Sequence, residues 1–362
     1  MGALVSSSQT DFGYRLQTYF NPKLLEALTY ELHLAEYGLR GKYPAHGTSI
    51  RFFRPRAASA ANVAVINAEG AGATHPGTSG LTEVAVGYID VPLSQRGALA
   101  KVTDIVQAID LLNTVALYVK TMAADAALDL DTVIRNALIV GLSDSNVKFG
   151  AWRFERFAGV TNTVDSSDDF ATHLALNQSQ GKITRLAHIG CVTQLKAAKV
   201  PTINGKYVAI VSPQVVHDMR QDTTWVSGAV YDVGTLWKRA AMMLDGCVFV
   251  ESMNPWIEND TYATYGATDT GTAGLIYSTF YLGEGAFGVP ELANDKAGSN
   301  PYGPKLMILA QPDKADPLNL VVTIGWKAYW GCKPLIATTD GSTPATGEVP
   351  RYVILRSKST FA

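Results

Sequence analysis

Three glycines in the stretch GEGAFG, from Gly283 to Gly288, have the spacing G-x-G-x-x-G of dinucleotide-binding sites. In such a site the glycines let the backbone approach a pyrophosphate, and the amides of a following helix receive its charge. The preceding run IYSTFYL predicts a strand, but Pro290 and further glycines and prolines come next, so no helix of useful length fits. We therefore expect no bound cofactor at these glycines, which then need another explanation, with a Rossmann-type oxidoreductase as the alternative from the enzyme class.

Two other stretches carry residue types that bind phosphate or metal ions. Residues 298–305, GSNPYGPK, are similar to a phosphate-binding loop, but Pro304 precedes the lysine and Leu306 stands where Ser or Thr should bind magnesium. His188 and Cys191 lie three apart on a predicted helix and could face one metal ion. Because no other histidine or cysteine is near them and both types are common in helix cores, we favour burial and expect no metal site.

The remaining acidic residues and histidines do not indicate hydrolysis. His217 and Asp218 are adjacent, so on a helix they should point about 100° apart and not pair with each other. No G-x-S-x-G turn supplies a nucleophile. Asp168, Asp169 and Glu284 could do acid–base work, but carboxylates in loops are usually only solvated. We predict that the chain is not an enzyme.

The composition limits the classes of partner. The 30 basic and 32 acidic residues give a net charge of −2, which argues against a strongly basic nucleic-acid surface or an electrostatic membrane anchor. Charged residues make up only 17% of the chain, against about 25% in an ordinary soluble protein, while aromatic residues stay at 9%. This composition is typical of surfaces buried between subunits, and equally of an Ala- and Gly-rich globular enzyme.

The chain length indicates the number of domains, and the cysteines indicate the redox compartment. A chain of 362 residues exceeds what one hydrophobic core usually organises, so we expect two domains or one domain with large excursions. Its three cysteines are far apart and odd in number, which predicts a reducing compartment and no disulfide framework. The sequence shows no secretory signal and no run long enough for a membrane span, so an origin in the cytosol is expected.

The first third of the chain predicts a helix followed by a long hairpin. Pro22 at a first helical position opens a helix that should end near Gly38 or Gly41. The segment GTSIRFFRPR then predicts a strand with one basic face, and LTEVAVGYIDVPL predicts a second strand. Residues 57–80 between them are small, Gly-rich and nearly uncharged, so they are the tip of a hairpin or, alternatively, a flexible linker.

The rest of the chain predicts a long helix and then a mixed α/β section. Apolar residues at helical spacing run from Thr103 or Asp104 to Gly141, and Asp129 and Asp131 could mark a break with a new N-cap. A second helix is expected within residues 182–200. Further elements follow in the order YVAIVS (strand), SPQVVHDMRQD (helix with Ser212 as N-cap), CVFVES (strand), PLNLVVTIGWKAYWG (strand) and RYVILRS (strand).

The order of these elements resembles the major capsid protein of tailed bacteriophages, with the Hong Kong 97 (HK-97) capsid fold, and most closely the phage N4-like branch. The segments that carry the resemblance cover most of the chain: LLEALTYELHLAEYGLRGK, YIDVPLSQRGALAKVTDIV, YVAIVSPQVVHDMRQDTTWV, CVFVES, STFYLGEGAFGVPEL and VTIGWKAYWGCKPL. The resemblance implies an α+β fold in which the glycines of GEGAFG form a turn after a strand.

The resemblance also implies a division into parts. Residues 1–42 would be the N-terminal arm, 43–98 an extended two-stranded loop, 99–203 the peripheral domain with its spine helix, 204–317 the axial domain, and 318–362 strands returning to the peripheral domain.

The implied function is structural. Copies of the chain would assemble into the hexamers and pentamers of an icosahedral phage head enclosing double-stranded DNA, which they would touch only by weak non-specific contacts. Portal, scaffolding and cement proteins would be the other partners, with no membrane involved, and the head would be assembled in the bacterial host cytoplasm. An encapsulin-type compartment shell is the alternative within the same fold. The expected intersubunit contact residues are Arg51, Arg54, Arg56, Val63, Val65, Trp326 and Lys327.

Overall fold

The structure is a computed structural model of the whole chain. It describes residues 33–43, 47–55, 86–103, 114–143, 155–160, 176, 179–222, 240–258, 276–291, 304–309, 318, 320–336 and 351–361.

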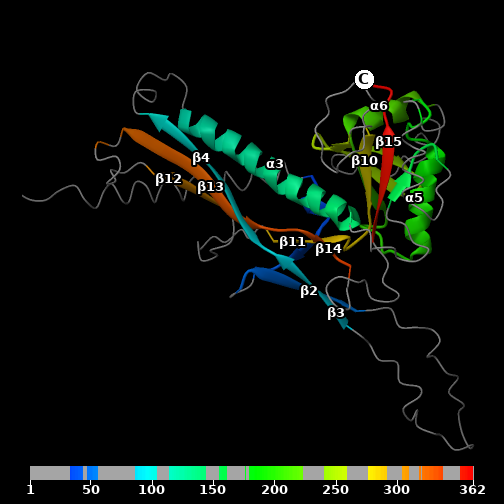
Figure 1. Cartoon of the computed structure of the whole chain (residues 1–362), viewed down its shortest axis with the longest axis horizontal. Helices are drawn as coiled ribbons and strands as arrows, with labels where there is room; N and C mark the ends of the chain where they lie inside the picture. Colours follow the sequence, from blue (N-terminus) through cyan, green and yellow to red (C-terminus); the bar gives the residue numbers. More distant parts are fainter. Residues whose placement is uncertain are drawn as a thin grey trace, which may run out of the picture.

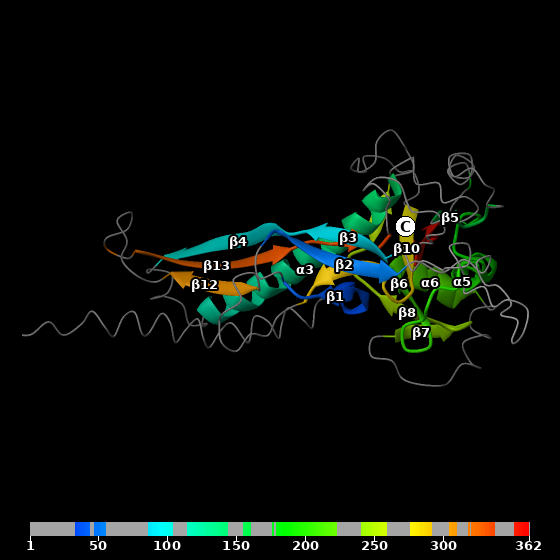
Figure 2. The ribbon, with the colours of Figure 1, turned by 90° about the horizontal axis from the view of Figure 1, so that it is seen from below.

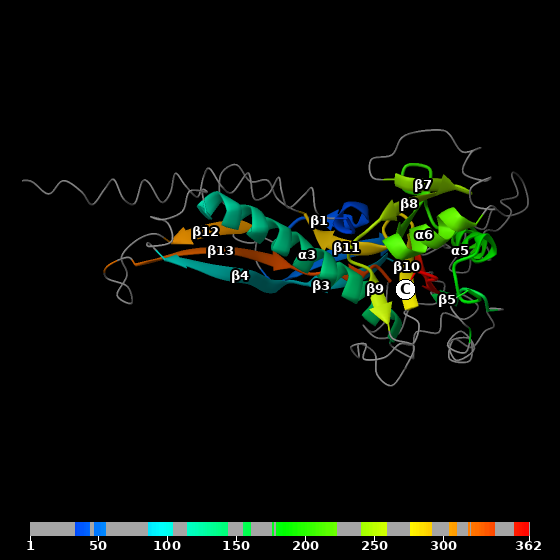
Figure 3. The ribbon, with the colours of Figure 1, turned by 90° about the horizontal axis from the view of Figure 1, so that it is seen from above.

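One half of the molecule is a long helix lying along a narrow sheet (Figures 1 and 3). The sheet has three antiparallel strands in the order β12-β13-β4, with bounds Lys305–Leu309, Val321–Trp330 and Ser94–Thr103. Helix α3, Thr114–Ser143, covers one face of this sheet. Every second residue of β13, from Val322 to Trp330, is buried beneath the helix, as the period of two of a half-covered strand requires.

Helix α3 runs without interruption through Asp129 and Asp131, so the predicted continuous helix is confirmed over the described residues and the alternative of a break there is wrong. Its 30 residues correspond to about 45 Å at ~1.5 Å per residue. Asp129 accepts a hydrogen bond from Arg96 Nη1 of β4 at 2.7 Å, and Asp131 accepts the backbone N–H groups of His33 and Leu34 at 2.9 and 3.3 Å. Because both carboxylates bond to other segments, neither acts as an N-cap. A helix start at Thr103 is wrong because Thr103 ends β4, and a start at Asp104 stays a prediction because residues 104–113 lie outside the described part.

The other half of the molecule is a compact seven-stranded mixed sheet (Figure 1). The strands run in the order β5-β15-β10-β6-β8-β7, and β9 pairs with β10 beside this path. Their bounds are Glu155–Phe157, Tyr352–Lys358, Ile276–Leu282, Tyr207–Val211, Cys247–Glu251, Ala240–Leu244 and, for β9, Trp256–Glu258. The strands predicted over YVAIVS, CVFVES and RYVILRS are therefore confirmed.

Two short helices, α5 and α6, pack on one face of the compact sheet, and both begin at hydroxyl caps. Helix α5, Arg185–Ala197, starts where Thr184 Oγ1 accepts the N–H of Ala187 at 3.3 Å. Helix α6, Pro213–Gln221, starts where Ser212 Oγ accepts the N–H of Val215 at 3.3 Å. Both helices and the Ser212 cap agree with the sequence prediction.

Strand alternation divides the apolar core between the two faces of the compact sheet. Residues such as Val208, Val250 and Ile354 share one apolar cluster with α3 and the long sheet. Residues such as Ala209, Phe249 and Leu355 share a second cluster with α5 and α6. One face of the compact sheet thus shares its apolar cluster with α3 and the long sheet, and the other face packs against the short helices.

The extended hairpin is confirmed for its two strands. Strands β2, Ser49–Pro55, and β3, Val86–Pro92, pair in antiparallel register, with Arg51 opposite Asp90. The inner face of the hairpin packs on Leu335 through its buried apolar side chains, Ile50, Phe52, Ile89 and Val91. Residues 57–80, expected as the hairpin tip or a linker, lie outside the described part.

A small three-stranded sheet joins the start of the described chain to the turn after β10. It consists of β1, Leu39–Gly41, parallel to β11, Phe287–Pro290, which also pairs with β14, Lys333–Pro334. The helix expected from Pro22 lies mostly outside the described residues. The described residues near its expected end form the 3₁₀ turn η1, Ala35–Tyr37, and an end at Gly41 is wrong because Leu39–Gly41 is a strand.

The sheets do not follow continuous segments of the chain. Residues 318–362, expected to return to one domain, supply β13 to the long sheet and β15 to the compact sheet. Residues 204–317 likewise supply β6 and β8 to the compact sheet but β12 to the long sheet. Among the described helices none is long and apolar enough to cross a membrane.

Candidate subunit-contact surfaces

The turn at GEGAFG uses its backbone amides internally. Strand β10 ends at Leu282, and β11, not a helix, follows the turn. The N–H of Gly283 donates to the carbonyl of Arg351 at 2.8 Å, and the N–H of Glu284 donates to that of Pro201 at 2.9 Å. Gly285 has φ +67, the left-handed conformation that glycine adopts without strain. The predicted structural turn is confirmed, and the Rossmann-type alternative is wrong because a strand follows the glycines where a dinucleotide site needs a helix.

We expect Gly283→Ala to lower the stability of the folded subunit, because the glycine has a structural role in the turn. A Cβ at this position would lie 2.2 Å from Cγ1 of Val200 and 3.0 Å from the carbonyl oxygen of Pro201, so the packing must shift. Overpacking of this kind costs about 1–3 kcal/mol, which urea unfolding would measure.

Calorimetric titration of the wild-type protein with NAD, NADP or FAD should show no saturable heat. Unchanged stability of the variant, or micromolar binding of a dinucleotide, would contradict this account of the turn.

His188 and Cys191 belong to the core beneath α5, as favoured from the sequence. The imidazole Nδ1 of His188 lies 3.1 Å from the hydroxyl of Tyr281, and the His188 ring contacts Phe249 with centroids 5.0 Å apart. Both residues are fully buried. Burial lowers the pKa of His188 to about 4 and raises the pKa of the Cys191 thiol to about 12. Within the described part of the chain, no three His, Cys, Asp or Glu residues are grouped as metal ligands would be.

The buried His188 should make the subunit less stable in mild acid. Its pKa is about 4 in the folded state against an ordinary 6.5, so as pH falls below 6.5 only the unfolded chain gains this proton. At about 1.4 kcal/mol per pKa unit, the stability lost between pH 6.5 and 4 approaches about 3 kcal/mol, with no effect above pH 6.5.

The His188→Phe variant isolates this contribution, because the other titrating groups are unchanged. Urea unfolding at pH 7 and pH 5 should give a smaller acid-induced loss for the variant than for the wild type. Equal losses in the two proteins would show that His188 is protonated while folded.

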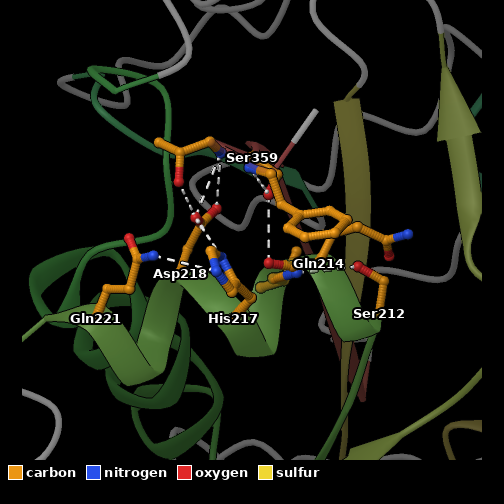
Figure 4. A network of polar contacts seen from close by, with 9 residues as sticks. Ser212, Gln214, His217, Asp218, Gln221 and Ser359 are labelled. Atoms are coloured by element: carbon orange, nitrogen blue, oxygen red, sulfur yellow. Dashed lines mark hydrogen bonds and ion pairs between the residues drawn. The ribbon is translucent and has the colours of Figure 1, made fainter.

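His217 and Asp218 anchor the end of the chain to α6 (Figure 4). Asp218 accepts hydrogen bonds from the N–H of Thr360 at 3.1 Å and from its hydroxyl, while Ser359 Oγ donates to the carbonyl of Gln214 at 3.3 Å. His217 Nδ1 lies 3.7 Å from Asp218 Oδ1, which is within ion-pair distance but too long for a hydrogen bond. The carboxylate is committed to Thr360, which makes this a structural anchor.

The other candidate chemical residues are only partly described. Residues 298–303 of the phosphate-loop-like stretch, with Asp168 and Asp169, lie outside the described part. Lys305, the lysine of that stretch, begins β12, and Leu306 beside it is buried. This lysine therefore stands in a strand and not at the start of a helix.

The outer face of the hairpin carries an exposed aromatic pair beside an ion pair. Phe53 and Tyr88 are cross-strand partners, and their exposed fractions are 69% and 55%. In the adjacent row Arg51 donates two hydrogen bonds of 2.8 Å to the Asp90 carboxylate, and its guanidinium lies 4.3 Å from the centre of the Tyr88 ring. These hydrogen bonds lower the pKa of Asp90. We call these four residues the hairpin outer face.

The second exposed surface is the face of the long sheet that α3 does not cover, seen from below in Figure 2. In the sheet register Leu99 of β4 and Met307 of β12 both lie opposite Gly325 of β13, so the three form one row on this face. Leu99 is 64% exposed and Met307 45% exposed. A Cβ on Gly325 would lie 3.0 Å from Leu99 Cδ1, so the leucine rests on the glycine. We call this row, with the flanking Lys327, the open sheet face.

The residues expected at subunit contacts fall in different places. Arg51 lies on the hairpin outer face, and Arg54 lies in β2 opposite Gly87, with its side chain undescribed. Arg56, Val63 and Val65 lie outside the described residues.

Strand alternation separates the other two expected contact residues. Lys327 lies on the open sheet face, with its Nζ 5.5 Å from the centre of the Tyr329 ring. Trp326 points to the opposite side, is 5% exposed and packs in the core under α3. Trp326 is therefore a residue of the subunit core, and its side chain is not offered on the open sheet face.

Sequence reasoning did not identify Phe53, Tyr88, Leu99 or Met307. The sequence does carry a signal for Phe53. Side chains alternate between the two faces of a strand, so if Ile50 and Phe52 are buried, Phe53 is an apolar residue on the exposed face. No comparable signal marks Met307, since its exposure depends on which face of the sheet α3 covers.

Taken together, a long helix along a three-stranded sheet, a hairpin leaving that sheet and a compact seven-stranded sheet beyond it define the HK-97-type capsid fold, an α+β fold. Comparison with solved structures agrees. The chain is similar to the capsid of Ralstonia phage GP4, with a TM-score of 0.60 and 12% identity over 90% of this chain and 87% of that chain.

Two further solved structures show the same likeness. The cyanophage Pam1 capsid has a TM-score of 0.56 and 15% identity, covering 93% of both chains. The acidic stable capsid of Helicobacter pylori bacteriophage KHP30 has a TM-score of 0.52 and 11% identity, covering 88% and 86%. The predicted fold is confirmed, whereas the closeness to the N4-like branch stays a prediction.

In the comparisons of sequence, no protein-family model and no curated protein matches the chain.

Proposed function

We propose that the chain is the major capsid protein of a tailed bacteriophage, a structural subunit that assembles into hexamers and pentamers of an icosahedral head. The observation that carries this proposal is the fold, shared over about nine tenths of the chain with phage capsids. The two exposed apolar surfaces support it, because a subunit that buries surface against neighbours on several sides needs more than one such patch.

The two surfaces are suited to a head-to-tail contact between copies. The hairpin outer face presents large aromatic side chains. The open sheet face presents Leu99 and Met307 beside a glycine, which has no side chain, so this surface protrudes less than the hairpin outer face. We propose that the hairpin of one copy rests on the open sheet face of the next. Many such contacts, each weak alone, would hold a closed shell together.

The parts of the subunit follow the sheets in this proposal. The long sheet with α3 would be the peripheral domain, the compact sheet with α5 and α6 the axial domain, and the hairpin the extended loop. The arm would lie within residues 1–42.

The remaining partners follow from the same proposal. The solved structures named above are phage capsids, which supports a phage head over an encapsulin-type compartment. Portal, scaffolding and cement proteins would complete the head, in the host cytoplasm, and the role would be structural and not catalytic. A net charge of −2 is compatible with DNA held by weak non-specific contacts only.

Expression of the chain followed by sedimentation velocity and negative-stain electron microscopy tests the proposal. We expect closed shells, or tubes and sheets of the same subunit, at raised protein concentration. A single small oligomer at every concentration, without larger assemblies, would contradict it.

A further inference from the structure

In the described part of the chain, five segments far apart in the sequence form hydrogen bonds to less than three turns of α3. Asp129 accepts from Arg96 of β4, and the carbonyl of Leu130 accepts from Trp330 Nε1 of β13 at 3.3 Å. Asp131 accepts the N–H groups of His33 and Leu34. Further along, the carbonyl of Leu138 accepts from the hydroxyl of Tyr352, in β15, at 3.4 Å. The long sheet and the compact sheet are therefore fastened to neighbouring turns of one helix.

The fifth segment is the connection between β8 and β9, and it reaches α3 through Asn254. The Asn254 Nδ2 group donates to Thr132 Oγ1 at 3.0 Å, and its Oδ1 accepts from Arg135 Nη1 at 2.5 Å. Arg135 Nη1 also donates to the carbonyl of Pro255 at 3.1 Å, and its guanidinium lies 5.3 Å from the centre of the Trp256 ring. We call this set of contacts the Asn254 bridge.

The Asn254 bridge is firmly attached to the compact sheet. The N–H of Ser252, two residues before Asn254, donates to the carbonyl of Val211 at the end of β6 at 2.9 Å, and Ser252 Oγ accepts the N–H of Asn254 at 3.3 Å. Trp256 starts β9 and pairs with Ser278 of β10. A movement of α3 relative to the compact sheet must therefore break the bridge.

The hydrogen bonds of the Asn254 bridge are directional, whereas the apolar packing between α3 and the compact sheet is not. Ile134, Leu138 and Ile139 of α3 share an apolar cluster with the facing residues of the compact sheet. Apolar contact is not directional, so it holds the helix on the sheet without choosing one angle between them. Hydrogen bonds weaken steeply away from their preferred geometry, and the two bonds of the Asn254 amide hold both Thr132 and Arg135.

We propose that the Asn254 bridge is a conformational device that fixes the angle between the long sheet and the compact sheet of the subunit. The consequence for shells rests on the proposed function. Every copy in a shell repeats this angle, so subunits with a poorly fixed angle would close into shells of unequal diameter.

The angle can be measured in unassembled subunits by electron spin resonance. Spin labels at Lys120→Cys on the α3 end of the long sheet and Lys196→Cys on α5 report the distance between the two halves, in a Cys332→Ala background. We expect Asn254→Ala and Thr132→Ala to broaden or shift this distance distribution. Thr121→Ala is the matched control and should leave it unchanged, because this hydroxyl donates to the carbonyl of Tyr118 within the same helix, at 3.0 Å.

Asn254→Asp serves as the conservative variant, because it keeps the acceptor for Arg135 and should retain most of the wild-type distribution. Among shells, Asn254→Ala should give a wider spread of diameters by electron microscopy. An Asn254→Ala distribution that matches the wild type, in a subunit whose thermal midpoint has fallen, would overturn the proposal and leave the bridge as a simple stabilising contact. The distance is measured in unassembled subunits, so it tests the role of the Asn254 bridge even if the proposed capsid function is wrong.

Discussion

Shell formation should be lost when Leu99 and Met307 are both changed to aspartate, while the subunit remains folded. Both side chains are exposed, Leu99 at 64% and Met307 at 45%, and they lie in one row of the open sheet face, so the charges cost little in the isolated subunit. In an assembled shell the same two carboxylates would be desolvated against the aromatic side chains of a neighbouring hairpin, at several kcal/mol in each of many contacts. The measurement is sedimentation of the double variant together with its circular-dichroism spectrum and thermal midpoint.

The matched control keeps this row apolar. Leu99→Met with Met307→Leu exchanges the two side chains and should assemble as the wild type does. If the aspartate variant built shells of normal size and thermal resistance, the open sheet face would not be a subunit contact.

A second large effect is expected at Leu138, where truncation should lower stability in the free subunit as well as in the shell. Leu138 is fully buried where α3 meets the compact sheet, and Leu→Ala at such positions costs about 2–5 kcal/mol. Chemical unfolding of Leu138→Ala would measure this loss directly.

Leu128 gives the control for Leu138 on the same helix. Its side chain is 55% exposed, so Leu128→Ala should change stability by less than about 0.5 kcal/mol. Equal losses for the two variants would mean that α3 is not packed between the sheets as described.

Local patterns were enough to predict most elements. Ser212 before Pro213 marks the start of α6 because a hydroxyl cap and a first-turn proline act within four residues. The strand phase of Ile50 and Phe52 placed the buried side of the hairpin. The turn at GEGAFG could be separated from a nucleotide site because Pro290 excludes a following helix.

Long-range partners could not be predicted in this way. The sequence left a helix break at Asp131 open as an alternative, since nothing near it in sequence reveals the amides of His33 and Leu34, which are more than ninety positions away. Trp326 looked like a contact residue, because the face of β13 that α3 covers is set by tertiary packing. The placing of β15 in the compact sheet and β13 in the long sheet depends in the same way on pairings across the whole chain.

An electron cryomicroscopy reconstruction of assembled particles tests the central claim most directly. We predict a closed shell in which the Phe53–Tyr88 pair of one subunit lies against Leu99 and Met307 of its neighbour, with α3 continuous from Thr114 to Ser143. A shell in which both surfaces face solvent would contradict the proposed contact, and a small closed oligomer without a shell would contradict the capsid function itself.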